Sequence, residues 1–497
     1  MSKELIIGVL IGYFAILIAI AWFTSRNADA DAFFTGNRQS PWYLVAFGMI
    51  GASLSGVTFI SVPGKVVGDG FHYFQVVLGY VLGYLVIAKL LMPLYYRLNV
   101  TSIYEYLNLR LGKTAYKTGA AFFILSRTLG SAIRLYLATL VLQLFIFGPM
   151  GVAYWITALI TVALIWIYTF KGGIKTIVYT DTFQTFFLVS SVIICVYVIA
   201  TKLHFSFPEL FQAIKSTKTA TGHSMGEVFQ FADPLAKNYF FKHFFGGMFL
   251  TIAMTGLDQD LMQKNLTCKN INEAQKNMYS FTVILVATNF LFLLVGGAMY
   301  VFAAKNQLTL PEATDHVFPT LALSNQFGSI AGIFFLLGIT ASSYASADSA
   351  LAALTTGFCI DFLNFKEKDE AVKKRQQLLV HIGFSILFLL IIIGTKAYVD
   401  SHKGTDLISL ILSVASYTYG PLLGLFAFGM FTKRTVNSAI LLPLICVAVP
   451  IACFYLDKFA PQLLNGYNFG FELLILNGLL TFSLLILNSK KPIYEEH

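Results

Sequence analysis

A run of small and hydroxyl-bearing residues at 338–363 is the part of the chain best suited to chemistry. Ser342, Ser346 and Ser349 follow i, i+4, i+7 spacing, which places three hydroxyls on one face of a helix. With Asp348, they offer hard oxygen ligands for a small dehydrated cation. Close helix packing, with serines bonded to their own backbone, remains an alternative for the hydroxyls. The carboxylate favours a site, because a lipid-facing helix does not tolerate an unpaired acid.

A second candidate is the segment 51–56, Gly-Ala-Ser-Leu-Ser-Gly, in the middle of an apolar run. Glycine costs about 1 kcal/mol in a helix interior. A helix break here would free backbone carbonyls and amides at membrane depth, as transporters do to bind ions and substrates. The alternative is a packing face made of small residues.

Charged residues inside apolar segments form the third group of candidates. Arg127 and Arg134 are seven residues apart and share a helix face. Each needs a carboxylate such as Asp258, an anionic solute, or a route to the interface. Asp181 near the start of a later segment has two readings, as a cation ligand or as a helix N-cap. Lys264 marks the cytoplasmic end of the segment that holds Asp258.

Two further local patterns carry predictions. The pair Gly420-Pro421 predicts a kink or a helix start at membrane depth, with Tyr417 as the neighbouring cavity residue. In the long connection 204–237, the stretch HSMGEVFQF at 223–231 favours a short interfacial helix.

The elements that must position these residues are membrane spans. The chain has 497 residues, of which 57% are hydrophobic and 12% charged, against roughly 25% charged in soluble domains. We therefore predict an all-α polytopic membrane protein, since about 20 apolar residues cross a bilayer. Thirteen apolar segments are expected to be transmembrane helices, at 4–24, 43–67, 72–97, 114–147, 151–170, 178–203, 238–264, 274–304, 327–363, 372–397, 405–431, 436–456 and 468–488.

The charge distribution predicts orientation and excludes several classes of protein. Most of the 34 Lys and Arg residues fall in one set of alternate loops, which places the N-terminus outside and the C-terminus in the cytoplasm. The net charge of +9 follows this topology and does not indicate nucleic acid. No nucleotide-binding or metalloprotease motif occurs in a credible context, and the five Cys show no disulfide or metal spacing. We expect no enzyme, and transport would be driven by an ion gradient.

Seven motifs in order resemble one family, the sodium/solute symporter family, which includes sialic acid, sugar, proline and monocarboxylate carriers. The resemblance covers essentially the whole chain. The motifs are F-x-G-x-R at 34–38, SGVTFISVPGK at 55–65, TSIYEYLNLRLG at 101–112, GGIKTIVYTDTFQ at 172–184, GLDQDLMQK at 256–264, the serine-rich stretch 342–349 with Asp361, and GPLLGLFAFGMF at 420–431.

The resemblance implies a single transmembrane transporter domain over residues 1–497. Its expected fold is a LeuT-type 5+5 inverted repeat, with one extra N-terminal helix and two extra C-terminal helices. The repeats would span 43–203 and 238–431, flanked by 1–42 and 432–497. It further implies a monomer in the bacterial inner membrane, with the lipid bilayer, sodium and a small organic solute as partners.

The resemblance also implies ion sites. A shared sodium site would take backbone carbonyls and hydroxyls at the positions of Gly51, Leu54, Ser342, Ala345 and Ser346. Some relatives add a second sodium, which corresponds to Asp181, Asp348 and Ser349. A carboxylate at 348 departs from the usual hydroxyl, so a second sodium or a coupled proton is compatible with this pattern.

Solute contacts transfer less directly from relatives. The turn at 53–59 is similar to the carboxylate-binding turn of sialic acid carriers, and a helix end with free amides suits a carboxylate. We expect sodium-coupled import of a sialic acid, another organic anion or a sugar; a proton-coupled carrier, an amino-acid symporter and an ion channel are the alternatives. The candidate solute residues are Ser53, Ser55, Thr58, Phe59, Tyr73, Gln75, Arg127, Arg134, Asp258, Gln259 and Tyr417.

Overall fold

The computed structural model describes residues 3–25, 35–169, 173–324, 326–363, 365, 368–402 and 407–491. Phe34 and Gly172, which open two of the motifs, lie outside these residues. The described chain is mainly helical, because a helix satisfies every backbone polar group within its own segment where no water is available. In the described ranges, the two strands β1 (Thr435–Val436) and β2 (Ser489–Lys490) form one short antiparallel pair.

The helices of the first half alternate long spans with short connecting turns. They are α1 (Lys3–Ser25), η1 (Gly36–Arg38), α3 (Trp42–Ser53), α4 (Gly56–Asp69), α5 (Tyr73–Val86), η2 (Ile87–Leu91), α6 (Met92–Leu98), α7 (Glu105–Leu111), α8 (Lys113–Leu142), η3 (Gln143–Phe147), η4 (Gly148–Met150), α9 (Tyr154–Thr169) and α10 (Gly173–Lys202).

The second half has the same character. Its helices are α11 (Phe207–Ser216), α12 (Phe240–Thr251), η5 (Ile252–Gly256), α13 (Gln259–Leu266), α14 (Ile271–Lys305), α15 (Thr314–Leu323), α16 (Ser329–Leu363), α17 (Glu370–Ser401), α18 (Leu407–Thr418), α19 (Gly420–Phe431), α20 (Leu441–Leu463) and α21 (Leu473–Leu487).

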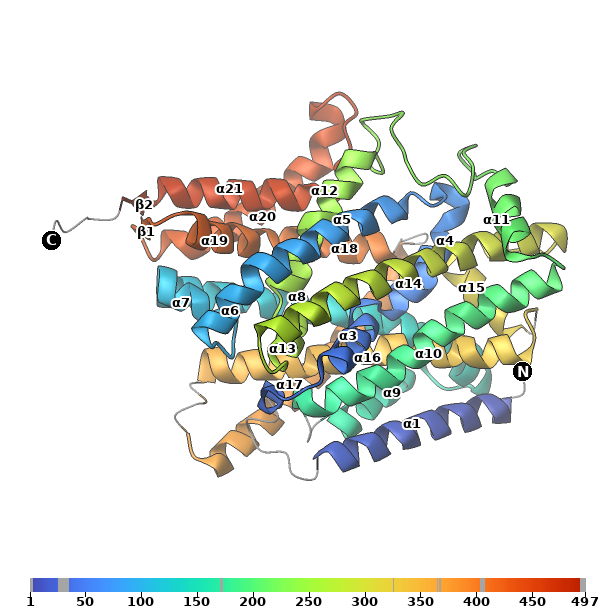
Figure 1. The fold of residues 1–497 in the computed structure, drawn as a ribbon, viewed down its shortest axis with the longest axis horizontal. Helices are drawn as coiled ribbons and strands as arrows, with labels where there is room; N and C mark the ends of the chain where they lie inside the picture. Colours follow the sequence, from blue (N-terminus) through green and yellow to red (C-terminus); the bar gives the residue numbers. More distant parts are fainter. Residues whose placement is uncertain are drawn as a thin grey trace.

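Most helices run along the long axis of the molecule, as expected for a membrane bundle (Figure 1). In the described residues, eight helices are long and apolar enough to cross a membrane, or up to eleven if each of three bent pairs is one span. The two remaining predicted segments contain the shorter apolar helices α9 and α21. The prediction of a polytopic all-α protein is therefore confirmed, and the count of thirteen crossings stays a prediction.

Three spans are broken. The predicted break after 51 is confirmed, because α3 and α4 meet at 61° with Leu54 and Ser55 between them. The predicted kink at Gly420 is also confirmed, with 40° between α18 and α19. The sequence analysis missed the third break, a 64° bend between η5 and α13. Asp258 caps α13 by accepting a hydrogen bond from the Asp260 amide, which stabilises a helix start in mid-membrane.

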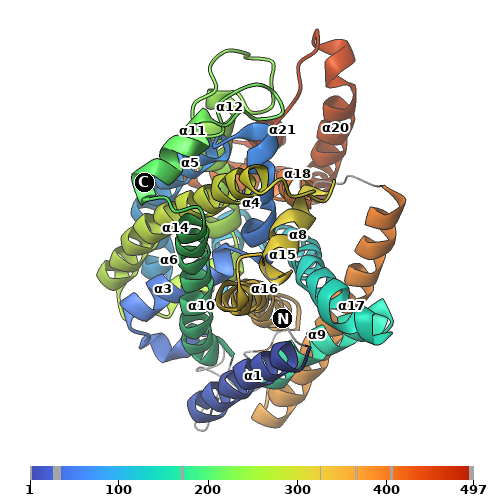
Figure 2. The same cartoon turned by 90° about the vertical axis from the view of Figure 1, so that its right-hand side faces the viewer.

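The serine-rich helix α16 lies at the centre of the bundle. Figure 2 shows it surrounded by α1, α8, α10 and α17, and these helices all contact it. Of its most apolar 18-residue window, 83% is buried, against 22% for the peripheral α20. A helix enclosed by protein on all sides can carry polar side chains, which explains why serines and an acid are accommodated there.

Two local predictions are wrong. Asp181 does not cap a helix, because α10 begins at Gly173 and Asp181 lies within it. Residues 223–231 form no helix, and the helix of this connection is α11 instead. Ser206 and Glu209 form a capping box at its start, with Pro208 in its first turn. The hydrogen bonds from Ser206 lower the pKa of the Glu209 carboxyl. This S-x-x-E signal was present in the sequence.

Helices α5 and α12 approach each other through glycines. A Cβ placed on Gly79 would overlap the carbonyl oxygen of Phe244, and one on Gly247 would overlap that of Val76. Small residues at such contacts let two backbones pack closely, which is the main source of helix association in lipid. Helix α5 also lines a small cavity, through Tyr73, Tyr80 and Tyr84.

We predict that Gly79→Val lowers thermal stability, because the added side chain must push α12 away from α5. Overpacking of this kind costs about 1–3 kcal/mol. The melting temperature of detergent-purified protein measures the effect. Gly12→Val on α1 is the matched control, since a Cβ there meets nothing within 4 Å. Equal melting temperatures for the two variants would contradict the close-contact interpretation.

Candidate functional site

The break between α3 and α4 lies directly against the serine-rich part of α16. A Cβ on Gly51 would lie 3.2 Å from the Ala345 Cβ, and one on Gly56 would overlap the Ser343 hydroxyl. The Gly51 amide donates a 2.9 Å hydrogen bond to Thr185 Oγ1 of α10. Three elements that are far apart in sequence therefore meet at the break.

The two predicted sodium-binding hydroxyls are enclosed at this contact. Ser342 and Ser346 are fully buried, and they donate to the carbonyls of Ile339 at 3.1 Å and Ser343 at 3.5 Å. Leu54 is non-helical (φ −92°, ψ 85°) and ends α3, although its amide still donates to the Ile50 carbonyl at 2.8 Å. Buried hydroxyls close to a broken helix supply oxygen ligands of the kind that a dehydrated monovalent cation requires.

A small cavity lies beside the break. Its volume is about 90 Å³. A larger cavity of about 550 Å³ lies next to it and shares Tyr73, whose hydroxyl is 3.2 Å from that of Tyr80. The polar residues that line the small cavity are Ser53, Ser55 and Thr58 of the break, Tyr73, Tyr80 and Tyr84 of α5, Arg127 and Arg134 of α8, and Thr251 and Thr255.

The two arginines of α8 differ in their partners. Arg127 is buried and forms ion pairs with Asp258, at 3.9 Å, and with Asp260. Arg134 is partly exposed and faces the cavity, and no carboxylate in the described part of the chain forms an ion pair with it. Arg127 is thus paired within the protein, whereas Arg134 lines the cavity without a direct ion pair and interacts with Asp258 only at longer range.

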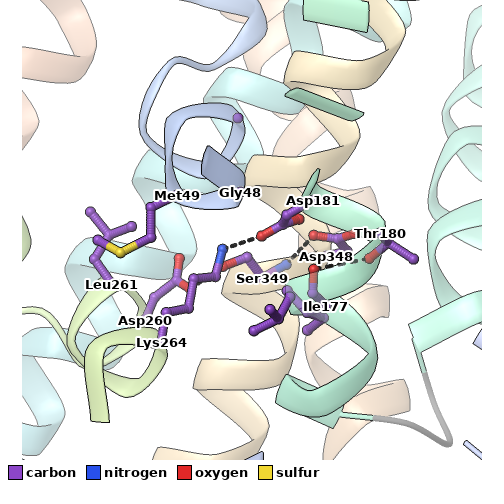
Figure 3. A network of polar contacts seen from close by, with 12 residues as sticks. Gly48, Met49, Ile177, Thr180, Asp181, Asp260, Leu261, Lys264, Asp348 and Ser349 are labelled. Atoms are coloured by element: carbon purple, nitrogen blue, oxygen red, sulfur yellow. Dashed lines mark hydrogen bonds and ion pairs between the residues drawn. The ribbon is translucent and has the colours of Figure 1, made fainter. Parts of the chain in front are cut away.

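A chain of buried polar contacts leads from Arg127, through Asp260, to the predicted second cation site. Figure 3 shows the part of this chain from Asp260 to Ser349 and Asp348. Asp260 also accepts a hydrogen bond from the Ser349 hydroxyl. The Ser349 amide donates to Asp348 at 2.5 Å, and the Tyr168 hydroxyl donates to the other oxygen at 2.8 Å. All of these side chains are fully or almost fully buried.

Asp181 lies beside this chain and has a partner that the sequence analysis did not assign. Lys264 Nζ lies 2.5 Å from Asp181 Oδ2, and both side chains are at most 2% exposed. Lys264 is therefore not a boundary residue exposed at the end of its span. Because α13 starts anew at Asp258, it turns inward and carries Lys264 into the bundle.

Five predicted solute residues do not line the small cavity, and one of them, Asp258, pairs with Arg127 instead. Phe59 is buried among the rings of Phe292, Phe318 and Phe335. Gln75 is buried, where it donates to the Asn238 carbonyl and accepts from the Gln230 amide. Phe59 and Gln75 lie on the faces of their helices that pack against other elements. Helix periodicity by itself could not reveal which face that is.

The other two are Gln259 and Tyr417. Gln259 accepts from the Ile103 amide at 2.9 Å and donates to the Thr101 carbonyl at 2.8 Å, so it anchors the turn before α7. The Tyr417 hydroxyl donates to Asp457 on α20. Its neighbour Tyr419 instead donates to Asp258, close to both arginines. Tyr419 lines a separate pocket of about 10 Å³, and neither tyrosine lines the small cavity, so a solute contact for Tyr417 stays a prediction.

The arrangement as a whole is that of an ion-coupled secondary transporter: a polytopic helical bundle with broken helices around a buried polar centre. Residues 33–446 match the family model described as "Sodium:solute symporter family". The chain belongs to the sodium:solute symporter family. It is accordingly a transport protein, with sodium as the co-transported ion.

Individual relatives are distant in sequence. A sodium/sialic acid symporter (NanT) of Aliivibrio fischeri is 25% identical over 446 residues, covering 87% of this chain and 84% of the relative. The human sodium/iodide cotransporter is 27% identical, over 81% of this chain and 61% of its own length. Human sodium-coupled monocarboxylate transporter 1 is 27% identical, over 85% of this chain and 68% of its own length.

A solved structure shows the same fold. It is described as the substrate-bound outward-open state of a sodium-coupled sialic acid symporter, and it superposes with a TM-score of 0.80 at 21% identity. The match covers 98% of this chain and 99% of the other. At 21% identity, this likeness shows that the two proteins share a fold.

Arg127 is expected to stabilise the fold. Replacing it by glutamine leaves Asp258 and Asp260 as buried anions without their cation, a change that typically costs about 3–5 kcal/mol. We predict a marked fall in melting temperature for Arg127→Gln. The control is Lys373→Gln, which breaks an exposed pair with Glu370 worth about 0–1 kcal/mol. If both variants melt alike, Arg127 does not hold the two carboxylates.

Proposed function

We propose that the protein imports a small organic anion together with sodium by alternating access. In this proposal, the chain crosses the bacterial inner membrane thirteen times as two inverted five-helix repeats, with one extra helix before them and two after. The loop charges support an N-terminus outside and a cytoplasmic C-terminus. The ends of the described chain support an odd number of crossings, because α1 begins at the right of Figure 1 and β2 lies at its left.

The proposed sodium site consists of Gly51, Leu54, Ser342, Ala345 and Ser346. The support is the close approach of the α3–α4 break to α16, with Gly51 against Ala345. An ion held between these two elements would touch both five-helix repeats. Sodium binding would therefore stabilise the conformation in which the two repeats are closed together. The free energy of sodium binding can in this way be coupled to solute binding.

The observation that carries the solute class is Arg134. The guanidinium of Arg134 is partly exposed into the cavity and has no ion pair with a carboxylate of the described chain, and an anionic solute would supply that partner. Tyrosine hydroxyls of α5 and the hydroxyls of Ser53 and Thr58 surround the same cavity and offer further hydrogen bonds. The names of the relatives, a sialic acid, an iodide and a monocarboxylate carrier, all describe anions.

The size of the cavity favours a compact solute. Pockets for drug-sized ligands typically have about 300–1,000 Å³, whereas this cavity has about 90 Å³. A carboxylate of a few carbon atoms fits such a space better than a nine-carbon sugar acid. The adjoining cavity of about 550 Å³ would be the route by which the solute reaches Tyr73.

Ser346→Ala tests the sodium site. We expect the sodium concentration for half-maximal uptake to rise about tenfold, which corresponds to about 1.4 kcal/mol of lost binding. Sodium-dependent uptake into proteoliposomes measures it. Ser385→Ala is the control, because Ser385 is also buried and bonds to its own helix backbone through the His381 carbonyl. Unchanged sodium dependence in Ser346→Ala would assign the serine to helix packing.

Arg134→Gln tests the solute class. We expect uptake of short carboxylates to fall by about 10–100-fold, since a charge-assisted hydrogen bond contributes roughly 1.5–3 kcal/mol. Thermal stability should change little, because no carboxylate of the described chain loses its ion-pair partner. Arg134→Lys keeps the charge and should retain part of the uptake. A neutral sugar that is transported equally well by wild type and Arg134→Gln would refute the anion assignment.

A further inference from the structure

The position of Lys264 bears on how many sodium ions the protein uses. Lys264 is on α13, and its ammonium lies 2.5 Å from Asp181 Oδ2 on α10. By the family resemblance given above, Asp181 corresponds to the acid of a second sodium site. Figure 3 shows the ammonium pointing from α13 directly at Asp181, with Asp348 on the far side of that carboxylate.

The charges around Lys264 show why a cation is needed there. The buried network contains four carboxylates, of Asp181, Asp258, Asp260 and Asp348, and two cations. Arg127 pairs with Asp258 and Asp260. Among the described residues, Lys264 alone forms an ion pair with Asp181, and it lies within electrostatic reach of Asp348 as well. One ammonium therefore serves the two acids that a second sodium would serve.

A sodium ion could bind beside Asp181 only at the expense of this pair. Displacing the ammonium would leave Lys264 charged among apolar neighbours such as Met49 and Leu261 (Figure 3). Breaking a buried pair in this way is strongly unfavourable, because the remaining charge has lost its partner without regaining water. The lysine is also covalently attached, so its local concentration at Asp181 far exceeds that of a free ion.

We propose that Lys264 is a resident cation that takes the place of a second sodium ion at Asp181 and Asp348, so that the protein couples each solute to one sodium. The proposal rests on the proposed function, since it concerns the stoichiometry of the same transport cycle. A tethered ammonium cannot be released on the other side of the membrane. It therefore adds no energy from the sodium gradient, but it pairs with Asp181 and partly offsets the charge of Asp348 in every state in which α13 stays against α10.

The same helix connects this position to the solute cavity. Asp260 and Lys264 are four residues apart on α13 and lie one turn from each other. Asp260 binds Arg127, which lines the cavity, and Lys264 binds Asp181. A shift of α13 on solute binding would therefore move both contacts together, which makes Lys264 a positioning residue for coupling.

The test is the sodium stoichiometry of purified protein in proteoliposomes, measured with ²²Na⁺ and a labelled short carboxylate at fixed membrane potential. We expect one sodium per solute and a sodium Hill coefficient of about 1 for wild type. In Lys264→Met, which removes the ammonium and keeps an unbranched chain, the coefficient should rise toward about 2 as sodium enters beside Asp181. Lys269→Met is the control, since Lys269 is exposed just beyond α13.

Each outcome has a defined meaning. Two sodium ions per solute in wild type, or an unchanged coefficient and sodium affinity in active Lys264→Met, would overturn the proposal while leaving sodium symport intact. Uptake without any sodium dependence would refute the proposed function itself. If Lys264→Met does not fold, Lys264→Met combined with Asp181→Asn removes both charges. That variant should keep one sodium per solute, and two would overturn the proposal.

Discussion

The structure depends on the requirement that charges buried in an apolar bundle be paired. Among the described residues, one buried polar network contains the carboxylates of Asp181, Asp258, Asp260 and Asp348 with the cations of Arg127 and Lys264, and each cation joins helices that are distant in the chain. Arg127 ties α8 to the start of α13, and Lys264 ties the end of α13 to α10. Removing either cation would leave acids that neither water nor lipid can solvate. The positions of α8, α10, α13 and α16 relative to one another follow from this constraint.

The broken helices make that arrangement possible. A continuous helix from Phe240 to Leu266 would carry Asp260 and Lys264 along the direction of α12. The bend of 64° instead redirects α13 toward the middle of the bundle. The break between α3 and α4 likewise brings Gly51 against α16 and disrupts the backbone pattern around Leu54. In both places a local loss of helical hydrogen bonds creates a polar position where the surrounding lipid offers none.

Arg134 differs from the buried Arg127, because it is partly exposed and has no direct ion pair among the described residues. Arg127 is satisfied within the protein, so it contributes mainly to the rigidity of the site. Arg134 faces a cavity, and no acid of the described chain pairs with it. The pair of arginines on one helix face thus has two roles, which the seven-residue spacing could not distinguish, because spacing reports the face of a helix and not the partners opposite it.

The amino-acid sequence by itself determined the class of the protein, since the composition, the apolar segments and the motif order reflect local chemistry. It also determined two of the three breaks, because Gly51, Gly56 and the Gly420-Pro421 pair weaken a helix wherever they lie. Ser53, Ser55, Thr58, Tyr73 and both arginines were correctly expected near one cavity.

Only the tertiary structure decided which polar side chains meet. It placed Phe59, Gln75, Gln259 and Tyr417 in packing or anchoring contacts, and it brought Tyr419 to Asp258. It also turned Lys264 from a residue expected at the membrane boundary into the partner of Asp181, which is 83 residues away in the chain. Ion pairs across such separations depend on how whole helices bend and pack, and no local pattern in the sequence contains that information.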